Sequence, residues 1–209
     1  GGDTVIYSGF DGKLWPAGGT RKVYEDNLDN GLPYWLSLNA GASFTQNAIG
    51  SVGGMTLSPD SSGVIDLNGP EIDLNTVRGI SLEFICTGAA GGNVEVQAGF
   101  FSASDGVLAR QRSGDNYMLM SGLASGVLNS QNGYYELNSA TKRFNPCVRF
   151  DIRQLTLSIG DGDQISAVRA LSVSEFTKAA AVRPRLKFIN AAGGFTRRVH
   201  YVKLTIDWI

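Results

Sequence analysis

The stretch from Ile80 to Phe100 reads ISLEFICTGAAGGNVEVQAGF and has the clearest strand pattern in the sequence. In its first half, apolar side chains occupy every second position from Ile80 to Cys86, and in its second half every second position from Val94 to Phe100. A period of two predicts β-strands with one buried face. The glycine-rich segment between the halves predicts a turn, so we expect an antiparallel hairpin.

The same alternation recurs along the chain and predicts further strands. We expect them at Thr4–Tyr7, Tyr117–Met120, Tyr134–Leu137, Val148–Ile159 and Ile165–Leu171. The apolar parity changes within Val148–Ile159, which favours a bulge or a corner near Arg153. The Asp-Gly of GDGD at 160–163 predicts a hairpin turn before Ile165.

The C-terminal part of the sequence predicts one more hairpin and one short helix. The last 27 residues, from Arg183, predict a closing hairpin turned at AAGG (191–194), with His200, Val202, Leu204, Ile206 and Trp208 on one face of a central final strand. Capping-box spacing of Ser172 and Glu175, an alanine run and Pro184 predict one short helix at 174–182. The class is therefore all-β, a two-layer antiparallel sandwich of about 10 to 14 strands, jelly-roll or concanavalin-like, with a barrel as the alternative.

Composition is typical of a folded domain. With 209 residues, 43% hydrophobic and 18% charged, we expect one domain over 1–209. No stretch has the length of apolar residues needed to insert into a membrane. The opening Gly1-Gly2, without an initiator methionine, is typical of a cloning remnant, so we expect the natural protein to be longer. Cys86 and Cys147 have opposite parity relative to their apolar neighbours, which disfavours a disulfide between them.

Charge is distributed unevenly along the sequence. Residues 1–141 carry 6 Lys and Arg against 14 Asp and Glu, a net charge of −8, whereas residues 142–209 carry 12 against 5, a net charge of +7. Alternation places Arg183, Arg185 and Lys187 on the outward face of one strand. We interpret them as a solvated face that could also bind an anionic surface glycan or the acidic half of a second subunit. The acidic remainder argues against nucleic-acid binding.

One motif carries a chemical resemblance. The run EIDLNT (71–76) resembles the catalytic strand E-I-D-x-E or E-I-D-x-x-E of retaining β-glucanases and laminarinases, in which alternate carboxylates flank one glycosidic bond. Glu71 and Asp73 match its first two acids, but Asn75 or Thr76 stands where the last glutamate belongs. Neither can protonate a leaving group, so we expect no enzyme and place Glu71 and Asp73 opposite Ile72 and Leu74.

Other catalytic and metal chemistries have weak signals. His200 is interpreted as a packed residue at a strand entrance rather than a general base. Calcium has two candidate sites, the loop EDNLDNG (25–31) and Asp161 with Asp163. Asp, Asn and Gly also build plain turns, and we favour that interpretation, so no cofactor is expected.

An aromatic pair suggests a binding platform. In LPYWLSL (32–38), Tyr34 shares parity with three leucines, which predicts that Tyr34 fills the core and that Trp35 is an exposed ring. An exposed tryptophan can pack on sugar C–H groups while neighbouring polar groups bind hydroxyls. The candidate ligand residues are therefore Trp35, Asp29 and Asn30, with Trp15 as a second ring and Arg183, Arg185 and Lys187 as an alternative site.

In overall character the chain resembles the jelly-roll or concanavalin-like domains of bacteriophage tail fibres and other virion appendages. It is rich in Gly, Ser and Asn, dense in predicted strands, and ends in the apolar strand YVKLTIDWI. The resemblance implies a homo-oligomeric, often trimeric, virion or extracellular protein that recognises a bacterial cell-surface glycan. Two alternatives stay open: a structural virion or adhesin module, and a carbohydrate-binding module of a secreted glycosidase.

Overall fold

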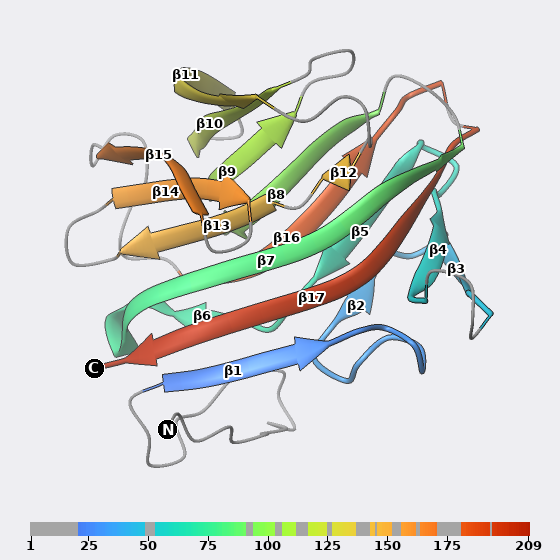
Figure 1. Cartoon of the computed structure of the whole chain (residues 1–209), viewed down its shortest axis with the longest axis horizontal. Helices are drawn as coiled ribbons and strands as arrows, with labels where there is room; N and C mark the ends of the chain where they lie inside the picture. Colours follow the sequence, from blue (N-terminus) through green and yellow to red (C-terminus); the bar gives the residue numbers. More distant parts are fainter. Residues whose placement is uncertain are drawn as a thin grey trace.

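Two antiparallel β-sheets packed face to face make up the described part of the chain (Figure 1). The computed structural model describes residues 21–48, 53–90, 94–102, 106–111, 117–124, 127–136, 143–144, 146–151, 156–161, 164–170, 181–192 and 194–209. Side-chain burial is described for 21–48, 53–86, 94–102, 106–110, 181–192 and 194–209. The expected strand at Thr4–Tyr7 and the ring of Trp15 lie outside these residues.

The nine-stranded sheet is built around the two longest strands that the structure describes, the antiparallel partners β7 (Val77–Ala90) and β17 (Thr196–Trp208). Its order is β15 (Gln164–Ala170), β14 (Thr156–Asp161), β13 (Pro146–Asp151), β7, β17, β4 (Met55–Ser58) and β3 (Ser43–Gln46). In addition, β1 (Arg21–Asp26) pairs with β17, and β12 (Arg143–Phe144) pairs with β7. The final strand is central, as the sequence predicts.

The eight-stranded sheet is centred on β16 (Ala181–Ile189). Its order is β11 (Val127–Glu136), β10 (Tyr117–Ala124), β9 (Gly106–Gln111), β8 (Glu95–Phe101), β16, β5 (Val64–Asn68) and β2 (Ser37–Leu38). The short β6 (Ile72–Asp73) also pairs with β16 and leads into a 3-10 turn, η1 (Leu74–Thr76). The 17 strands described exceed the number expected, because two-residue strands such as β2 and β6 leave no period in the sequence.

The core lies between the sheets. The nine-stranded sheet and the eight-stranded sheet contribute the alternate residues that sequence periodicity predicts, among them Leu82, Phe84, Leu204 and Ile206 from the first and Val96, Phe100, Leu186 and Phe188 from the second. Burying each such side chain contributes about 1.5–3 kcal/mol. Cys86 belongs to the same face and is a free, buried thiol, as expected. Desolvation raises the pKa of this thiol well above its ordinary value.

The predicted hairpin partners are wrong in two places. β7 and β8 lie in different sheets, and so do β16 and β17. In each case the chain crosses from one sheet to the other instead of turning back on its neighbour (Figure 1). Alternation identifies the face of a strand that meets the core, but opposite walls of one core have the same pattern, so the hydrogen-bonded partner is not specified.

Three other local predictions need correction. The parity change within Val148–Ile159 separates two paired strands, β13 and β14, rather than marking a bulge in one. The expected helix at 174–182 ends in residues that begin β16, and its remainder lies outside the described residues. A register shift between Val199 and Tyr201 resets the alternation in β17 so that Val199 and Val202 are both buried. His200 therefore leaves the core face at a bulge. The β14–β15 hairpin at GDGD is confirmed.

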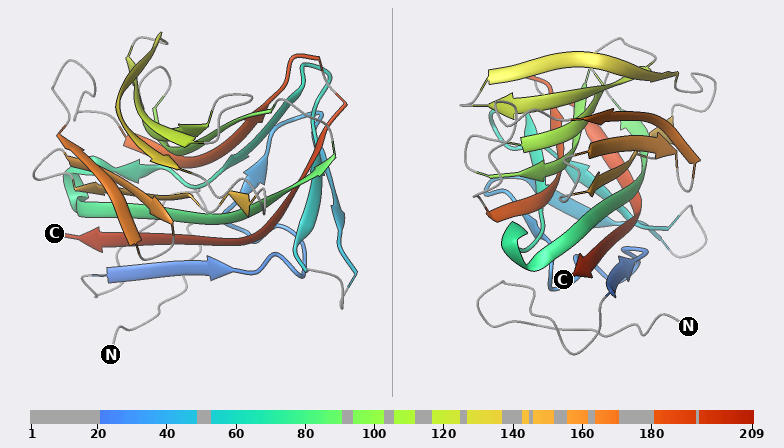
Figure 2. Two further views of the ribbon diagram at one scale, coloured as in Figure 1. Left: turned by 45° about the horizontal axis from the view of Figure 1, so that its top comes forward. Right: turned by 90° about the vertical axis from the view of Figure 1, so that its left-hand side faces the viewer.

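Curvature gives the two sheets different outer surfaces. Figure 2 shows the eight-stranded sheet bent so that the face turned away from β7 and β17 is concave. β10 and β11 rise at one end of this face, and the ends of β5 and β16 rise at the other. No helix in the described part of the chain is long and apolar enough to span a membrane.

Candidate functional site

Strand β16 divides its side chains between the core and the concave face. Val182, Leu186 and Phe188 are buried in the core cluster, whereas Arg183 is exposed and Arg185 and Lys187 are partly exposed. The outward row of three cations predicted from alternation is therefore present. Its surroundings depend on strands that are distant in sequence.

Strand pairing places acidic and amide groups next to these cations. Lys187 lies opposite Asp66 of β5 on one side and Gln97 of β8 on the other, and Gln97 in turn lies opposite Arg110 of β9. Cross-strand neighbours on one face are close enough to interact. We call the resulting surface the charged face and define it by Asp66, Glu95, Arg110, Arg183, Arg185 and Lys187.

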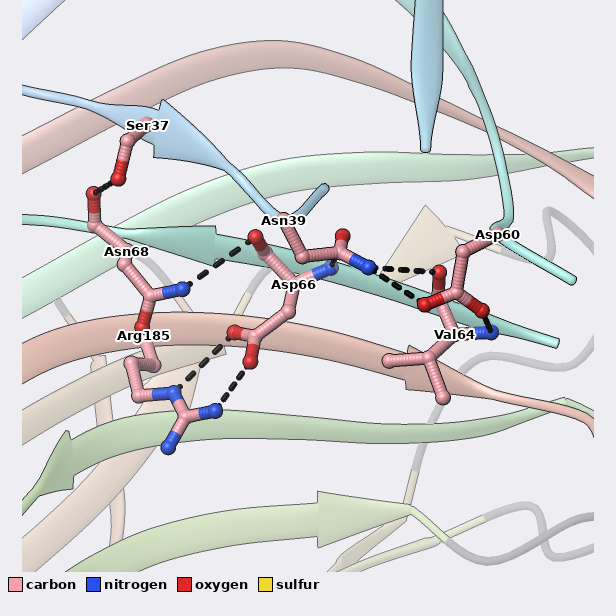
Figure 3. Close-up of polar contacts among 7 residues, drawn as sticks. All are labelled: Ser37, Asn39, Asp60, Val64, Asp66, Asn68 and Arg185. Carbon is pink, nitrogen blue, oxygen red and sulfur yellow. Dashed lines mark hydrogen bonds and ion pairs between the residues drawn. The ribbon is translucent and has the colours of Figure 1, made fainter. Parts of the chain in front are cut away.

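Asp66 and Arg185 form a bidentate ion pair on the charged face. Arg185 Nε donates to Asp66 Oδ1 at 3.1 Å, and Arg185 Nη2 donates to Asp66 Oδ2, so the pair is bidentate (Figure 3). The side chain of Asp66 is 10% exposed and that of Arg185 is 24% exposed. The guanidinium also lies over the ring of Phe101, with Cζ 5.0 Å from the ring centroid. These contacts fix both charged groups in orientation.

Asn39, which follows β2, holds the backbone of Asp66 in place through two hydrogen bonds. Asn39 Oδ1 accepts the backbone N–H of Asp66 at 2.8 Å, and the backbone N–H of Asn39 donates to the Asp66 carbonyl at 3.0 Å. Asn39 Nδ2 in turn donates to Asp60 Oδ2 at 2.8 Å. Figure 3 shows this chain of contacts running from Arg185 through Asp66 and Asn39 to Asp60. The Asp66 end of the charged face is therefore rigid before any ligand arrives.

A second bidentate pair lies two strands away. Arg110 Nε donates to Glu95 Oε1 at 2.7 Å, Arg110 Nη2 donates to Glu95 Oε2 at 2.8 Å, and Gln97 Nε2 donates to Glu95 Oε1 at 2.6 Å. Burial by itself raises the pKa of Glu95. The hydrogen bonds from Arg110 and Gln97, together with the charges of Arg110 and Lys187, outweigh burial and hold that pKa below its ordinary value.

The lowered pKa of Glu95 predicts acid-dependent stability. Because the folded-state pKa lies below the unfolded value of about 4.3, the stabilisation is complete above that value and is lost as pH falls through the folded pKa. We expect Glu95→Gln to cost about 2 kcal/mol at pH 7. Urea unfolding from pH 7 to pH 3 should show the wild-type advantage shrinking below about pH 4.3. A constant difference across this range would contradict the assignment.

The EIDLNT motif does not place two free carboxylates on one strand. Glu71 Oε2 lies 3.6 Å from Arg183 Nη2 in a partly exposed ion pair. Asp73 caps the 3-10 turn, with Oδ1 accepting the backbone N–H of Asn75 at 2.9 Å. Ile72 and Leu74 are buried, as expected for residues opposite these acids. The strand part of the motif is only two residues long, so the carboxylate spacing of the glucanase resemblance is absent here.

The aromatic assignment at Tyr34 and Trp35 is reversed. Trp35 is 7% exposed and packs with its ring centroid 5.9 Å from that of Tyr24, whereas Tyr34 is 58% exposed. These residues lie outside the strands, in the segment between β1 and β2, where strict alternation does not hold. Trp35 is therefore a core residue and cannot serve as the exposed ring of a binding platform.

The polar loop beside Trp35 is occupied by structural contacts. Asp29 Oδ1 accepts the backbone N–H of Gly54 at 2.8 Å, and Asp26 Oδ1 accepts that of Leu28 at 2.6 Å. Asn30 is exposed. The loop thus contacts the turn before β4 of the nine-stranded sheet, away from the cations of β16. The structure does not bring the two groups of candidate residues together.

The remaining candidates fit structural roles. His200 Nδ1 lies 3.2 Å from the Gly53 carbonyl at the same turn. In loop 25–31, Asp26 and Asp29 accept backbone N–H groups and Glu25 accepts the hydroxyl of Tyr201 at 2.8 Å. Asp163 lies outside the described residues. Within the described residues, no group of three or more His, Cys, Asp or Glu side chains is arranged to hold a metal ion.

Sequence reasoning missed the anionic half of the charged face. Asp66 has the outward parity between Ile65 and Leu67, and Glu95 has it before Val96, so alternation signals both. Their partners Arg185 and Arg110 are 119 and 15 residues away. Only knowledge of the strand order would have joined them.

No family model and no curated protein matches the sequence. Solved structures do match the fold. A β-glucanase of Bacillus licheniformis aligns with a TM-score of 0.61 at 10% identity, over 87% of this chain and 97% of its own. Peanut lectin aligns with a TM-score of 0.60 at 10% identity, over 90% and 98%. The CBM2 module of the evolved Dit protein of Lactobacillus casei BL23 phage J-1 gives 0.55 at 12%, over 90% and 98%. The chain therefore has the concanavalin-like sandwich fold found in lectins and glucanases.

Proposed function

We propose that this chain is a non-enzymatic carbohydrate-recognition domain that binds bacterial cell-surface polysaccharide on the charged face. The observation that carries the proposal is the set of oriented polar groups on a concave sheet surface. Sugar hydroxyls are bound by donors and acceptors held at fixed positions, and convergent polar groups in a concavity are typical of ligand sites. Asp66, Arg185 and the Glu95–Arg110 pair meet this requirement.

The same contacts favour binding over hydrolysis. General acid–base catalysis at a glycosidic bond needs a carboxyl group that can exchange a proton with the substrate. In the part of the chain that the structure describes, Asp66 and Glu95 each bind an arginine through both oxygens. With both oxygens bound to a guanidinium, neither carboxyl group is positioned to give a proton to a glycosidic oxygen or to take one from water. These two carboxylates therefore suit recognition of hydroxyl groups better than proton transfer.

The likeness of the fold to solved structures supports a proposal about the protein to which this domain belongs. The concanavalin-like fold is shared with a lectin and with a CBM2 module from a phage Dit protein, which supports a place on a phage tail fibre or similar surface appendage. The domain would then be virion-borne or extracellular and part of a homo-oligomer, with a trimer as the first candidate. Light-scattering mass of the purified chain tests the oligomer: a monomeric mass over the micromolar range would contradict it.

Binding is tested on an array of bacterial polysaccharides at low and moderate salt. We expect a subset to be bound and Arg183→Gln, which lies at the exposed end of the charged face, to weaken that binding about five- to tenfold. Arg21→Gln is the matched control, since Arg21 forms an exposed ion pair with Asp207 at the nine-stranded sheet. No binding by the folded wild-type protein would overturn the proposal in favour of a structural module.

A further inference from the structure

The charged face has an excess positive charge near its centre, at Lys187. Arg185 is neutralised by Asp66, and Arg110 by Glu95, each through two hydrogen bonds. Arg183 has Glu71 as a longer-range partner at 3.6 Å. Among the described residues, Lys187 has no oppositely charged side chain within 4 Å, although its charge contributes to the lowered pKa of Glu95. One positive charge is therefore left over.

The position of Lys187 makes this charge available to a ligand. It lies between the two bidentate pairs, opposite Asp66 of β5 and Gln97 of β8. Its side chain is partly exposed, and it projects from the concave side of β16, opposite the buried Leu186 and Phe188. Because Asp66 and Glu95 are each bound to an arginine, Lys187 can bind an anionic group of a ligand while both bidentate pairs stay intact.

We infer that the polysaccharide bound here is acidic and that one of its carboxylates lies against Lys187. The inference rests on the proposed function and narrows its ligand class to uronic-acid polysaccharides. A single surplus ammonium matches a singly charged carboxylate, and Arg185, which is 24% exposed and lies in the same outward row, can donate to a neighbouring hydroxyl. The partial burial of Lys187 makes such a contact less sensitive to salt than a fully exposed pair would be.

The test uses alginate, hyaluronan and xanthan, each paired with its carboxyl-reduced form, and dextran and curdlan as neutral polymers. Carboxyl reduction leaves the backbone of the polymer in place and turns each carboxylate into an alcohol. We expect wild-type protein to bind at least one acidic polymer about tenfold or more tightly than its reduced form. Lys187→Gln should remove that preference, and Lys187→Arg should retain most of it.

Controls separate the inference from general electrostatics. Lys203→Gln makes the same change of charge on β17 of the nine-stranded sheet and should leave binding unchanged. Equal affinity of wild type and Lys187→Gln for the acidic polymers would overturn the inference, as would tighter binding of teichoic acid, a phosphodiester polymer, than of every uronate. Binding of only neutral or reduced polymers would overturn it while leaving the proposed function intact. Failure to bind any polymer would instead overturn the proposed function itself.

Discussion

Replacing Gly54 by alanine is expected to lower the free energy of unfolding by about 4 kcal/mol or more. Gly54 has φ +71°, a left-handed conformation that costs an alanine about 1–2 kcal/mol. The larger cost is steric: a Cβ atom would overlap the carbonyl oxygen of Val199 and stand 2.8 Å from Cα of His200. Both belong to the backbone at the bulge of β17, which cannot rotate away as a side chain would.

The turn around Gly54 is also a junction of hydrogen bonds. Its N–H donates to Asp29 Oδ1 at 2.8 Å, and its carbonyl accepts Gln46 Nε2 at 2.7 Å. Displacing Gly54 therefore weakens the contact of the loop that follows β1, and it also disturbs the start of β4. Urea unfolding at pH 7 measures the effect.

Gly194→Ala is the matched control for this prediction. Gly194 has φ +68°, but a Cβ atom there would have no neighbour within 4 Å. We expect Gly194→Ala to cost about 1–2 kcal/mol, from the backbone conformation alone. A similar decrease in the free energy of unfolding for Gly54→Ala and Gly194→Ala would contradict the prediction that the close approach of Gly54 to β17 makes the alanine costly.

Replacing Trp35 by alanine is expected to cost about 3–5 kcal/mol, the range for removing a large aromatic side chain from a core. The ring packs against Tyr24 of β1, whose own burial raises its pKa to about 12, with a smaller contribution from Tyr34. Tyr34→Ala, one residue away but 58% exposed, should cost less than about 1 kcal/mol. Thermal and urea unfolding of the two variants give the comparison.

A third variant, Trp35→Phe, distinguishes a packing role of Trp35 from a role in ligand binding. If the charged face is the glycan site, Trp35→Phe, which keeps an aromatic ring in the core, should bind polysaccharide as the wild type does. A loss of affinity in Trp35→Phe without a loss of stability would restore Trp35 as a ligand residue. Equal destabilisation by Trp35→Ala and Tyr34→Ala would contradict the burial described for this segment.

The charge asymmetry of the sequence is partly resolved within one chain. β16, from the basic part, lies between β5 and β8, from the acidic part. Asp66 and Glu71 therefore have arginine partners inside the fold. The predicted basic row is real, but most of its charge is neutralised by residues more than 100 positions away. Subunit contacts need not be invoked for these pairs.

Local pattern predicted the faces of strands more reliably than their partners. The buried residues of β7 and β16, and those of β17 from Val202 onward, follow directly from apolar alternation, because a pleated strand sends successive side chains to opposite sides. In β8, by contrast, Gln97 and Phe101 on the other face are buried as well. Outside regular strands this geometry fails. Trp35 and Tyr34 lie in an irregular segment, and His200 lies at a bulge, so parity assigned all three to the wrong surroundings.

From the sequence alone we predicted an all-β fold, with a sandwich favoured over a barrel, the core-facing side of most of the longer strands, and an outward row of three cations. These properties depend on residues two or a few positions apart. The tertiary structure was needed to show that β7 and β8 lie in opposite sheets and that the basic row faces a concave surface. It was also needed to show that Lys187, unlike Arg183 and Arg185, has no acidic side chain within 4 Å among the described residues. The reason is that strand pairing joins residues as far as 186 positions apart, such as Arg21 and Asp207, and hydrogen-bonded neighbours along a sheet leave no period in the sequence.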